Sequence, residues 1–372
     1  MQISTNTTGM LSGLTVFTDK DGRDHCVVVV KGTFTVRQDS TVTLAEEQQP
    51  LVYADQHYGD PGSTSIQYEC DFAPSKPRAD VIVNGFAISK NENPVREMLV
   101  GLQVGQIKKI IKVFGDRYWD TGLAGLRPSD PKPFIKIPLK YENAFGGTDQ
   151  TSDDPKKWGF ELRNLVGVGF YTGNEFGSVA GKPIPNLEDA RQPISSWYDR
   201  PAPAAFGGLA RGWQPRIKFA GTYDQHWLDQ RFPFLPEDFD HQYFQSAPAD
   251  QQFPYLKGGE AVRCVNMTPE GNFSFTVPQL EIPITYRFRD RNVTTKPNLD
   301  TLIVEPDQYR FIATWRVMIP LGRKIHNLRE ITVGHPPKST APARTANGKL
   351  HFSSINEAIA WKKHQDKPVD DA

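Results

Sequence analysis

Short runs of β-branched and aromatic residues dominate the first part of the chain. Residues 27–30 are four consecutive valines, and Thr-Phe-Thr-Val follows Gly32 at 33–36. Residues 41–44 alternate between apolar and polar side chains, and 80–87 form another apolar-rich run. Because such side chains fit the pleated surface of a sheet, each of these runs predicts a strand.

A hairpin is predicted where two longer apolar-rich runs meet at Gly105. The runs occupy 98–104 and 106–114. Glycine tolerates the positive φ angles that tight reversals require, so the two runs are expected to pair as antiparallel strands.

The β pattern returns near the C-terminus. Residues 260–267 and 272–277 flank Thr-Pro-Glu-Gly, a sequence typical of a turn. Further strands are predicted at 282–288, 299–305 and 310–319. In the last run every second residue is apolar, which places those side chains on one face of a strand.

The middle of the chain differs, because prolines recur throughout 116–252. Proline removes a backbone donor and interrupts both helices and central strands. Only short elements fit, such as a strand at 216–220 and one or two helical turns within 237–245. The many aromatic residues argue against disorder, so ordered loops are expected.

These patterns predict a mainly-β fold. The scaffold is expected to be a β-sandwich or an open barrel that carries long ordered loops rich in proline, glycine and aromatic residues, with few short helices. We divide the chain into a β-rich part at 1–115, a loop-rich central segment at 116–252, a second β-rich part at 253–333, and a linker and tail at 334–372. A short helix is predicted at 355–363.

The balance of charge gives no general attraction to anionic partners. The chain has 43 Lys and Arg residues against 43 Asp and Glu residues, so its formal net charge is zero. No global field draws it to nucleic acid or to an anionic membrane. Lys108, Lys109 and Lys112 are the best candidates for a local basic patch, although polar residues on the solvent face of a strand explain them better.

Cysteine content and the N-terminal sequence indicate a location. Cys26, Cys70 and Cys264 are too few and too scattered for a disulfide framework or a zinc site, which favours a reducing compartment. The first residues lack the pattern of a signal peptide, and the apolar run at 26–30 is too short to span a bilayer. We therefore expect a cytoplasmic protein without a membrane partner.

Two glycine–aromatic motifs stand out in the central segment. Residues 141–147 read Tyr-Glu-Asn-Ala-Phe-Gly-Gly, and Phe-Gly-Gly recurs at 206–208. Paired glycines permit close backbone approach, and an aromatic residue before them can anchor a sharp turn. Tyr141 and Phe145 are expected to be buried, and Glu142 to bond backbone amides or an arginine such as Arg216. From the sequence, each motif could form either an internal corner or a binding surface.

Residues that could support catalysis lie in the densest part of the loops. His226, Asp229, Asp238, Asp240 and His241 are close in sequence but lack the spacing of a metal site, so we predict no metal and no cofactor. The carboxylate pairs Asp224 with Glu237, or Glu142 with Asp224, could serve as acid and base in a hydrolase acting on carbohydrate.

The sequence resembles one bacterial family, the domain of unknown function 2169, which is associated with type VI secretion. The shared motifs run in order through most of the chain. They lie at 30–34, 79–83, 114–119, 141–147, 167–170, 185–188, 213–216, 220–227, 235–239, 247–251, 258–260 and 315–316. Residues 163–167 read Arg-Asn-Leu-Val-Gly, where the family has Asn-Pro before the glycine.

The resemblance implies an adaptor or chaperone and no catalysis. Such proteins stabilise an effector toxin and help to load it onto a spike made of a VgrG trimer and a PAAR-like cap. The loops of the central segment would then organise or form the partner surface. The residues we expect there are Tyr141, Glu142, Phe145, Gly146, Gly147, Trp213, Arg216, Tyr223, Asp224, Trp227, Asp238 and Phe239.

Two alternatives stay open from the sequence. One is the hydrolase, with its carboxylates between Asp224 and Asp240. The other is a structural component that leaves the cell on the secreted spike.

Overall fold

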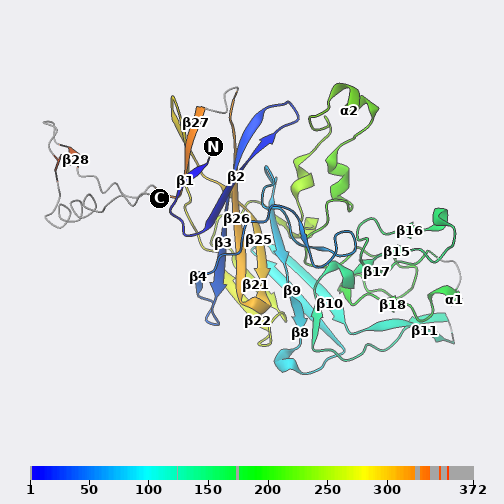
Figure 1. The fold of residues 1–372 in the computed structure, drawn as a ribbon. Coiled ribbons are helices and arrows are strands. Elements are labelled where there is room, and N and C mark those ends of the chain that lie inside the picture. Colours follow the sequence, from blue (N-terminus) through cyan, green and yellow to red (C-terminus); the bar gives the residue numbers. More distant parts are fainter. Residues whose placement is uncertain are drawn as a thin grey trace, which may run out of the picture.

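The computed structural model describes residues 2–123, 125–172, 176–322, 327–335, 343–344 and 350–351 (Figure 1). Strands make up most of the regular structure, and none of the sheets formed by these residues closes into a barrel. The predicted mainly-β fold is therefore confirmed. The helix predicted at 355–363 and most of the predicted tail lie outside the described residues.

The largest sheet has seven strands and is buried on both faces along its central strands. Its order is β2 (Leu11–Thr18), β3 (Asp24–Val36), β26 (Arg310–Pro320), β25 (Asn298–Glu305), β7 (Ala79–Val83) and β20 (Gln252–Phe253), with β4 (Val42–Leu44) paired to β3. All these pairs are antiparallel except β25 with β7, which is parallel.

Two further sheets complete the scaffold. A five-stranded sheet has the order β19 (Leu187–Asp189), β10 (Ile107–Phe114), β9 (Glu97–Val104), β21 (Ala261–Val265) and β22 (Asn272–Thr276). A four-stranded sheet has the order β1 (Ile3–Asn6), β27 (Leu328–Val333), β23 (Ile284–Phe288) and β24 (Asn292–Thr295).

Three stacked phenylalanine rings connect the two larger sheets. Phe34 on β3 stacks on Phe311 of β26 with ring centroids 4.9 Å apart. Phe275 on β22 stacks on the same Phe311 ring at 4.3 Å, with an interplanar angle of 3°. Because Phe275 belongs to the five-stranded sheet, the stack shows that the sheets pack face to face as in a sandwich.

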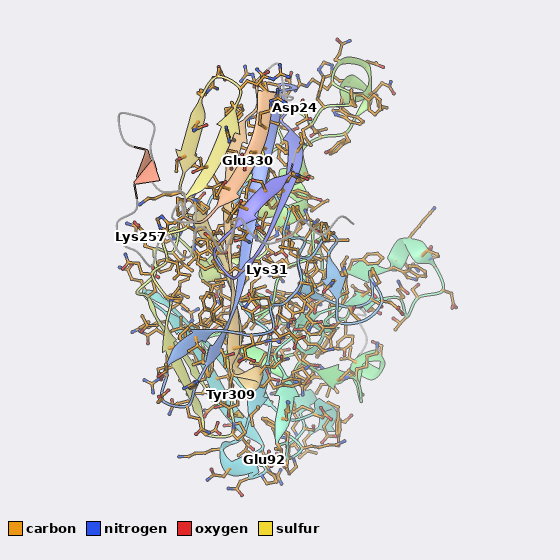
Figure 2. The ribbon with its side chains drawn as sticks, turned by 60° about the vertical axis from the view of Figure 1, so that its left-hand side comes forward. Asp24, Lys31, Glu92, Lys257, Tyr309 and Glu330 are labelled. Carbon is orange, nitrogen blue, oxygen red and sulfur yellow. The ribbon has the colours of Figure 1, made fainter. Side chains whose placement is uncertain are left out.

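The two β-rich parts of the sequence share these sheets. β3 pairs with β26 along most of their lengths, and β9 pairs with β21. In Figure 2, Asp24 at the start of β3 lies near the top and Tyr309, just before β26, lies low, so the paired strands span much of the molecule. Strand pairing between the first and the second β-rich parts thus holds the scaffold together.

Short elements occupy the rest of the chain. In one three-stranded sheet, β11 (Arg117–Gly122) pairs with β12 (Gly125–Pro128) and β18 (Pro183–Ile184). The other small sheets have two strands each: β13 (Lys136–Pro138) with β8 (Phe86–Ile88), β14 (Phe145–Gly146) with β17 (Val168–Gly169), β15 (Thr148–Asp149) with β16 (Gly159–Phe160), β5 (Gln56–His57) with β6 (Ile66–Tyr68), and β28 (Ala343–Arg344) with β29 (Leu350–His351). The α-helices are α1 (Phe176–Val179) and α2 (Gln225–Gln230). The 3₁₀ turns are Lys90–Glu92, Tyr141–Asn143, Pro155–Lys157, Arg216–Ala220, His241–Phe244, Ala249–Gln251 and Pro306–Gln308.

Most strand predictions are confirmed, and the exceptions have local causes. The hairpin at Gly105 forms, with Val104 opposite Ile107. The run at 80–87 divides into β7 and β8, because Asn84 and Gly85 separate them. The strand predicted at 216–220 is wrong, since Arg216–Ala220 is a 3₁₀ turn that follows Pro215.

Candidate functional site

An exposed cluster of large apolar side chains lies around α2. We call residues 221–240 the aromatic lobe. Tyr223 is 53% exposed, Leu228 52% and Phe232 66%, and Phe234 is also exposed. Figure 1 shows α2 at the periphery of the molecule, apart from the large sheets. Exposed apolar side chains grouped in this way are typical of a contact surface for another macromolecule.

Trp227 holds the aromatic lobe together from within. Its ring makes edge-on contacts with Tyr223 at 4.8 Å and with Phe232 at 5.6 Å between centroids. The indole Nε1 donates to the carbonyl oxygen of Phe234 at 2.8 Å, and the Asp224 carboxylate accepts from the Trp227 amide at 2.9 Å. Asp224 is thus the N-cap of α2, and it starts the helix in a fixed place.

Asp238 links the two ends of the aromatic lobe through hydrogen bonds to Thr222. Its carboxylate accepts from the amide of Thr222 at 2.9 Å and from the Thr222 hydroxyl at 2.8 Å. The hydrogen bond from the Thr222 amide is the main reason that the pKa of Asp238 lies below its ordinary value. Phe239, the next residue, packs against the rings of Tyr243 and Phe244, with ring centroids 6.0 Å and 5.7 Å away.

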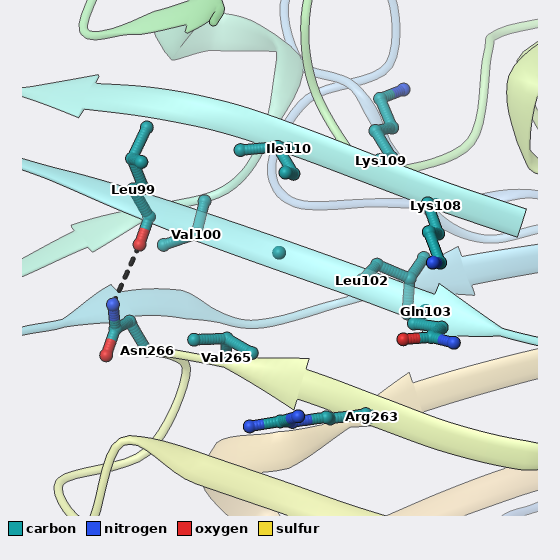
Figure 3. Close-up of a pocket in the computed structure, with 11 residues that line it drawn as sticks. Leu99, Val100, Leu102, Gln103, Lys108, Lys109, Ile110, Arg263, Val265 and Asn266 are labelled. Carbon is teal, nitrogen blue, oxygen red and sulfur yellow. Dashed lines mark hydrogen bonds between the residues drawn. The ribbon is translucent and has the colours of Figure 1, made fainter.

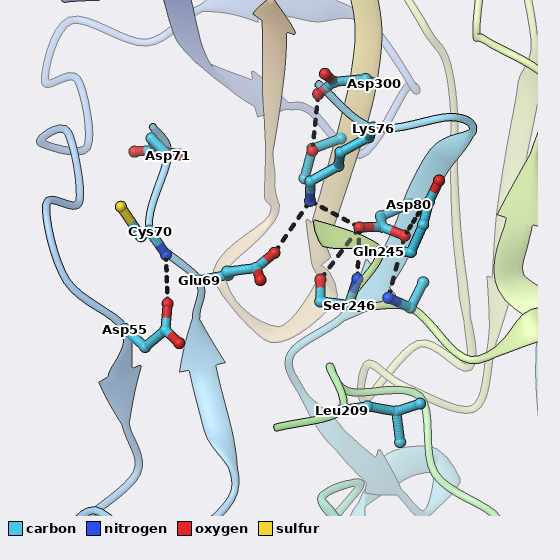
Figure 4. A network of polar contacts seen from close by, with 12 residues as sticks. Asp55, Glu69, Cys70, Asp71, Lys76, Asp80, Leu209, Gln245, Ser246 and Asp300 are labelled. Carbon is cyan, nitrogen blue, oxygen red and sulfur yellow. Dashed lines mark hydrogen bonds and ion pairs between the residues drawn. The ribbon is translucent and has the colours of Figure 1, made fainter. Parts of the chain in front are cut away.

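Beneath these loops lies a network of ion pairs, most of whose members are buried. The network joins five cations, Lys31, Lys76, Arg211, Arg216 and Arg316, to five carboxylates, Asp55, Glu69, Asp71, Asp80 and Asp300. Its balanced charge matters because an isolated charge in a protein interior is costly. Figure 4 shows its central part around Lys76.

Glu69 is the carboxylate on which three of these cations converge. It pairs with Arg216, with Lys76 at 3.2 Å between Nζ and Oε2, and with Arg211 at 3.3 Å between Nη2 and Oε1. Burial by itself raises the pKa of the Glu69 carboxyl, but the three cations outweigh burial and lower it to about 2. Glu69 is therefore a carboxylate at neutral pH.

Asp80 ties the central loops to the seven-stranded sheet. It lies on β7, and its carboxylate pairs with Lys76 at 2.7 Å. The same carboxylate accepts from Gln245 Nε2 at 2.7 Å and from the amides of Ser246 and Ala247 at 2.9 Å and 3.1 Å. Arg216 joins two parts of these loops to each other, because its guanidinium donates to the backbone carbonyls of Leu209 and Tyr243.

The first Phe-Gly-Gly motif is an internal corner. Tyr141 and Phe145 are buried as predicted, and Trp213 contacts Tyr141 edge-on at 5.5 Å. Asn164, which is fully buried, donates from Nδ2 to the carbonyl oxygens of Tyr141 and Phe145 at 2.8 Å and 3.0 Å. Gly147 has φ +102°, and a Cβ there would lie 2.4 Å from the Gly167 carbonyl oxygen.

The predicted site residues thus fall into two groups. The first group is buried and shapes the loops: Tyr141, Phe145, Gly146, Gly147, Trp213 and Arg216. The second group builds the lobe: Tyr223, Asp224, Trp227, Asp238 and Phe239. Tyr223 is the exposed aromatic residue of the second group. Glu142 bonds a backbone amide as expected, that of Ser65 at 3.0 Å. The alternative prediction, that Glu142 pairs with Arg216, is wrong, since Arg216 pairs with Glu69.

The carboxylates considered for hydrolysis are engaged in local contacts. Asp224 caps α2 and Asp238 binds Thr222. The general acid of a glycosidase has a raised pKa, so the lowered pKa of Asp238 argues against that one role for this carboxylate. Among the described residues no group of three His, Cys, Asp or Glu side chains is arranged to hold a metal ion.

Several important residues were missed by sequence reasoning. Leu228, Phe232 and Phe234 contribute most of the remaining exposed apolar surface of the lobe, but in a proline-rich segment they follow no period that marks a surface. Asp80, Asp300 and Arg316 offered a usable signal, because each interrupts an otherwise apolar strand sequence. A charge inside such a run predicts a buried partner.

Comparison with known proteins places the chain in a family. Residues 21–316 match the family described as "Uncharacterized protein conserved in bacteria (DUF2169)". The chain belongs to this family. The DUF2169 match covers the five-stranded sheet, the buried ionic network, the aromatic lobe and the seven-stranded sheet except β2 and the end of β26. No curated protein and no solved structure matches the chain. None of the described helices has the length and apolar character needed to cross a membrane.

Proposed function

We propose that this DUF2169 protein is a non-catalytic adaptor that binds another polypeptide through its aromatic lobe. The observation that carries the proposal is the combination of exposure and fixed position. Tyr223, Leu228 and Phe232 offer apolar area to solvent, while the Asp224 cap and the Trp227 indole fix their backbone. An interface gains most from apolar anchors that lose little freedom on binding.

The rigid base of the lobe supports the same role. Asp80 connects the loops that carry the lobe to the seven-stranded sheet, and Arg216 connects them to Glu69 after β6, in both cases through charge-assisted hydrogen bonds. Such bonds are stronger than those between neutral groups. A partner that buried the lobe would therefore dock on a surface that is already formed.

The resemblance to proteins associated with type VI secretion suggests which polypeptide is bound. The polypeptide bound would be an effector toxin, and the adaptor would help to load it onto a VgrG or PAAR-like spike protein. In this role the protein acts in the cytoplasm, either released after loading or carried out on the spike.

Co-expression with the toxin encoded beside the gene tests the proposal. The toxin should become more soluble and should co-purify with the adaptor. An unchanged yield of soluble toxin, together with no co-purification, contradicts the proposal. Recovery of the adaptor in secreted fractions favours a component that leaves with the spike over one that is recycled.

A further inference from the structure

A groove on the outer face of the five-stranded sheet forms a second surface that is separate from the aromatic lobe. Gly101 on β9 forms its floor, and in the strand register it lies between Ile110 of β10 and Val265 of β21. Because glycine has no side chain, this row of the sheet is hollow. The groove has a volume of about 310 Å³.

Apolar side chains line this groove although it faces solvent. Leu99 is 51% exposed and Ile110 is 53% exposed, and Figure 3 shows them on neighbouring strands. A solvated sheet face ordinarily carries polar side chains. Exposed Leu and Ile beside a hollow therefore mark a place where another chain gains free energy by burial.

The next row of the same face is positively charged. Lys108 and Arg263 lie on either side of Gln103 in the register. Neither forms an ion pair with a described residue, and the Arg263 guanidinium donates only to the amide oxygen of Asn272, at 3.2 Å. Lys112, farther along, pairs with Glu97 at 3.0 Å. Two uncompensated cations thus adjoin the apolar hollow on a chain whose net charge is zero.

We infer that this groove binds an acidic segment of a partner polypeptide, with apolar side chains entering above Gly101 and carboxylates meeting Lys108 and Arg263. A second copy of the chain is disfavoured, since a symmetric contact would bring these like charges together. The inference deepens the proposed adaptor role and rests on it only for the existence of a polypeptide partner.

Gly101→Val is the sharpest variant for testing this site. A Cβ at Gly101 would meet nothing closer than Val265 Cβ at 3.8 Å and the Lys109 carbonyl oxygen at 3.9 Å. The Cβ of valine therefore has room at this position, its two methyl groups would occupy the hollow, and valine suits a strand. Lys108→Glu combined with Arg263→Glu reverses the charge instead. Thr276→Glu, on β22 of the same sheet and outside the groove, is the matched control.

The probe is a displayed library of short random peptides, panned against the full-length protein. Peptides that combine Asp or Glu with apolar residues should be enriched, and their affinity should fall at least about tenfold in Gly101→Val, or ~1.4 kcal/mol. Charge reversal should shift the enrichment toward Lys and Arg, and Thr276→Glu should change neither result.

Three outcomes overturn the inference. They are enrichment without acidic residues, equal binding by Gly101→Val and wild type, and self-association of the wild type that Gly101→Val abolishes. Because the library contains no toxin, such a failure is distinguishable from a failure of the adaptor proposal in co-purification.

Discussion

Arg216 and Glu69 form a buried ion pair although 147 residues separate them in the sequence. Arg216 lies in the 3₁₀ turn before the aromatic lobe, and Glu69 directly follows β6. The pair therefore joins the central loops to the N-terminal part of the chain. Its energetic role leads to the first two predictions.

Glu69→Gln should destabilise the protein by about 3–5 kcal/mol, since it leaves Arg216 and Lys76 buried without full compensation. Urea denaturation measures the effect as a shift of the unfolding midpoint. Glu281→Gln is the control, because the pair of Glu281 with Lys296 lies at the surface. Its midpoint should equal that of the wild type, and equal shifts for the two variants contradict the role of the network.

Glu69 should also make stability depend on pH. Its pKa falls from an ordinary 4.5 to about 2 in the folded protein, so the unfolded chain binds more protons between these values. The stabilisation is present in full above pH 4.5 and is lost as the pH falls toward 2. The free energy of unfolding of the wild type should therefore decline more steeply across this window than that of Glu69→Gln. Parallel profiles contradict the assignment.

Gly147→Ala should destabilise the corner at the first Phe-Gly-Gly motif. The added Cβ would approach the Gly167 carbonyl oxygen to 2.4 Å, and φ at Gly147 is +102°. Strain of this kind costs about 1–3 kcal/mol, which thermal or urea unfolding detects. Gly212→Ala provides the comparison, because a Cβ there meets no heavy atom within 4 Å. If both variants unfold alike, the corner does not depend on Gly147.

Leu228→Ser combined with Phe232→Ser should remove toxin binding and leave the fold intact. Both side chains are exposed, so their loss changes the contact surface more than the core. We expect the amount of co-purified toxin to fall at least about tenfold, as removal of central apolar anchors does in other interfaces. The unfolding midpoint should stay at the wild-type value.

Tyr198→Ser controls for a general loss of exposed aromatic surface, because Tyr198 is exposed outside the lobe. It should retain toxin as the wild type does. Retention by the Leu228 and Phe232 double variant would remove the lobe from the proposed interface.

Local patterns in the sequence were sufficient to predict most strands of the scaffold. The valines at 27–30 and the alternation at 310–319 predict strands that the structure forms as β3 and β26. Gly105 marks the hairpin correctly. These features depend on neighbouring residues, whose preferences for extended backbone act over a few positions.

The site depended on contacts that no local pattern contains. Asp80 meets Gln245 and Ser246 from 165 and 166 residues away, and proline-rich loops give no period from which to infer such a pairing. The hollow at Gly101 likewise exists only because the register brings Ile110 and Val265 to its sides.

The sequence by itself thus determined the strand content and the burial of Tyr141 and Phe145. Only the tertiary structure decided which aromatic residues face solvent and which charges compensate one another. The physical reason is that strand propensity acts between neighbours, whereas the exposure of a side chain and the pairing of a charge depend on segments far apart in the chain.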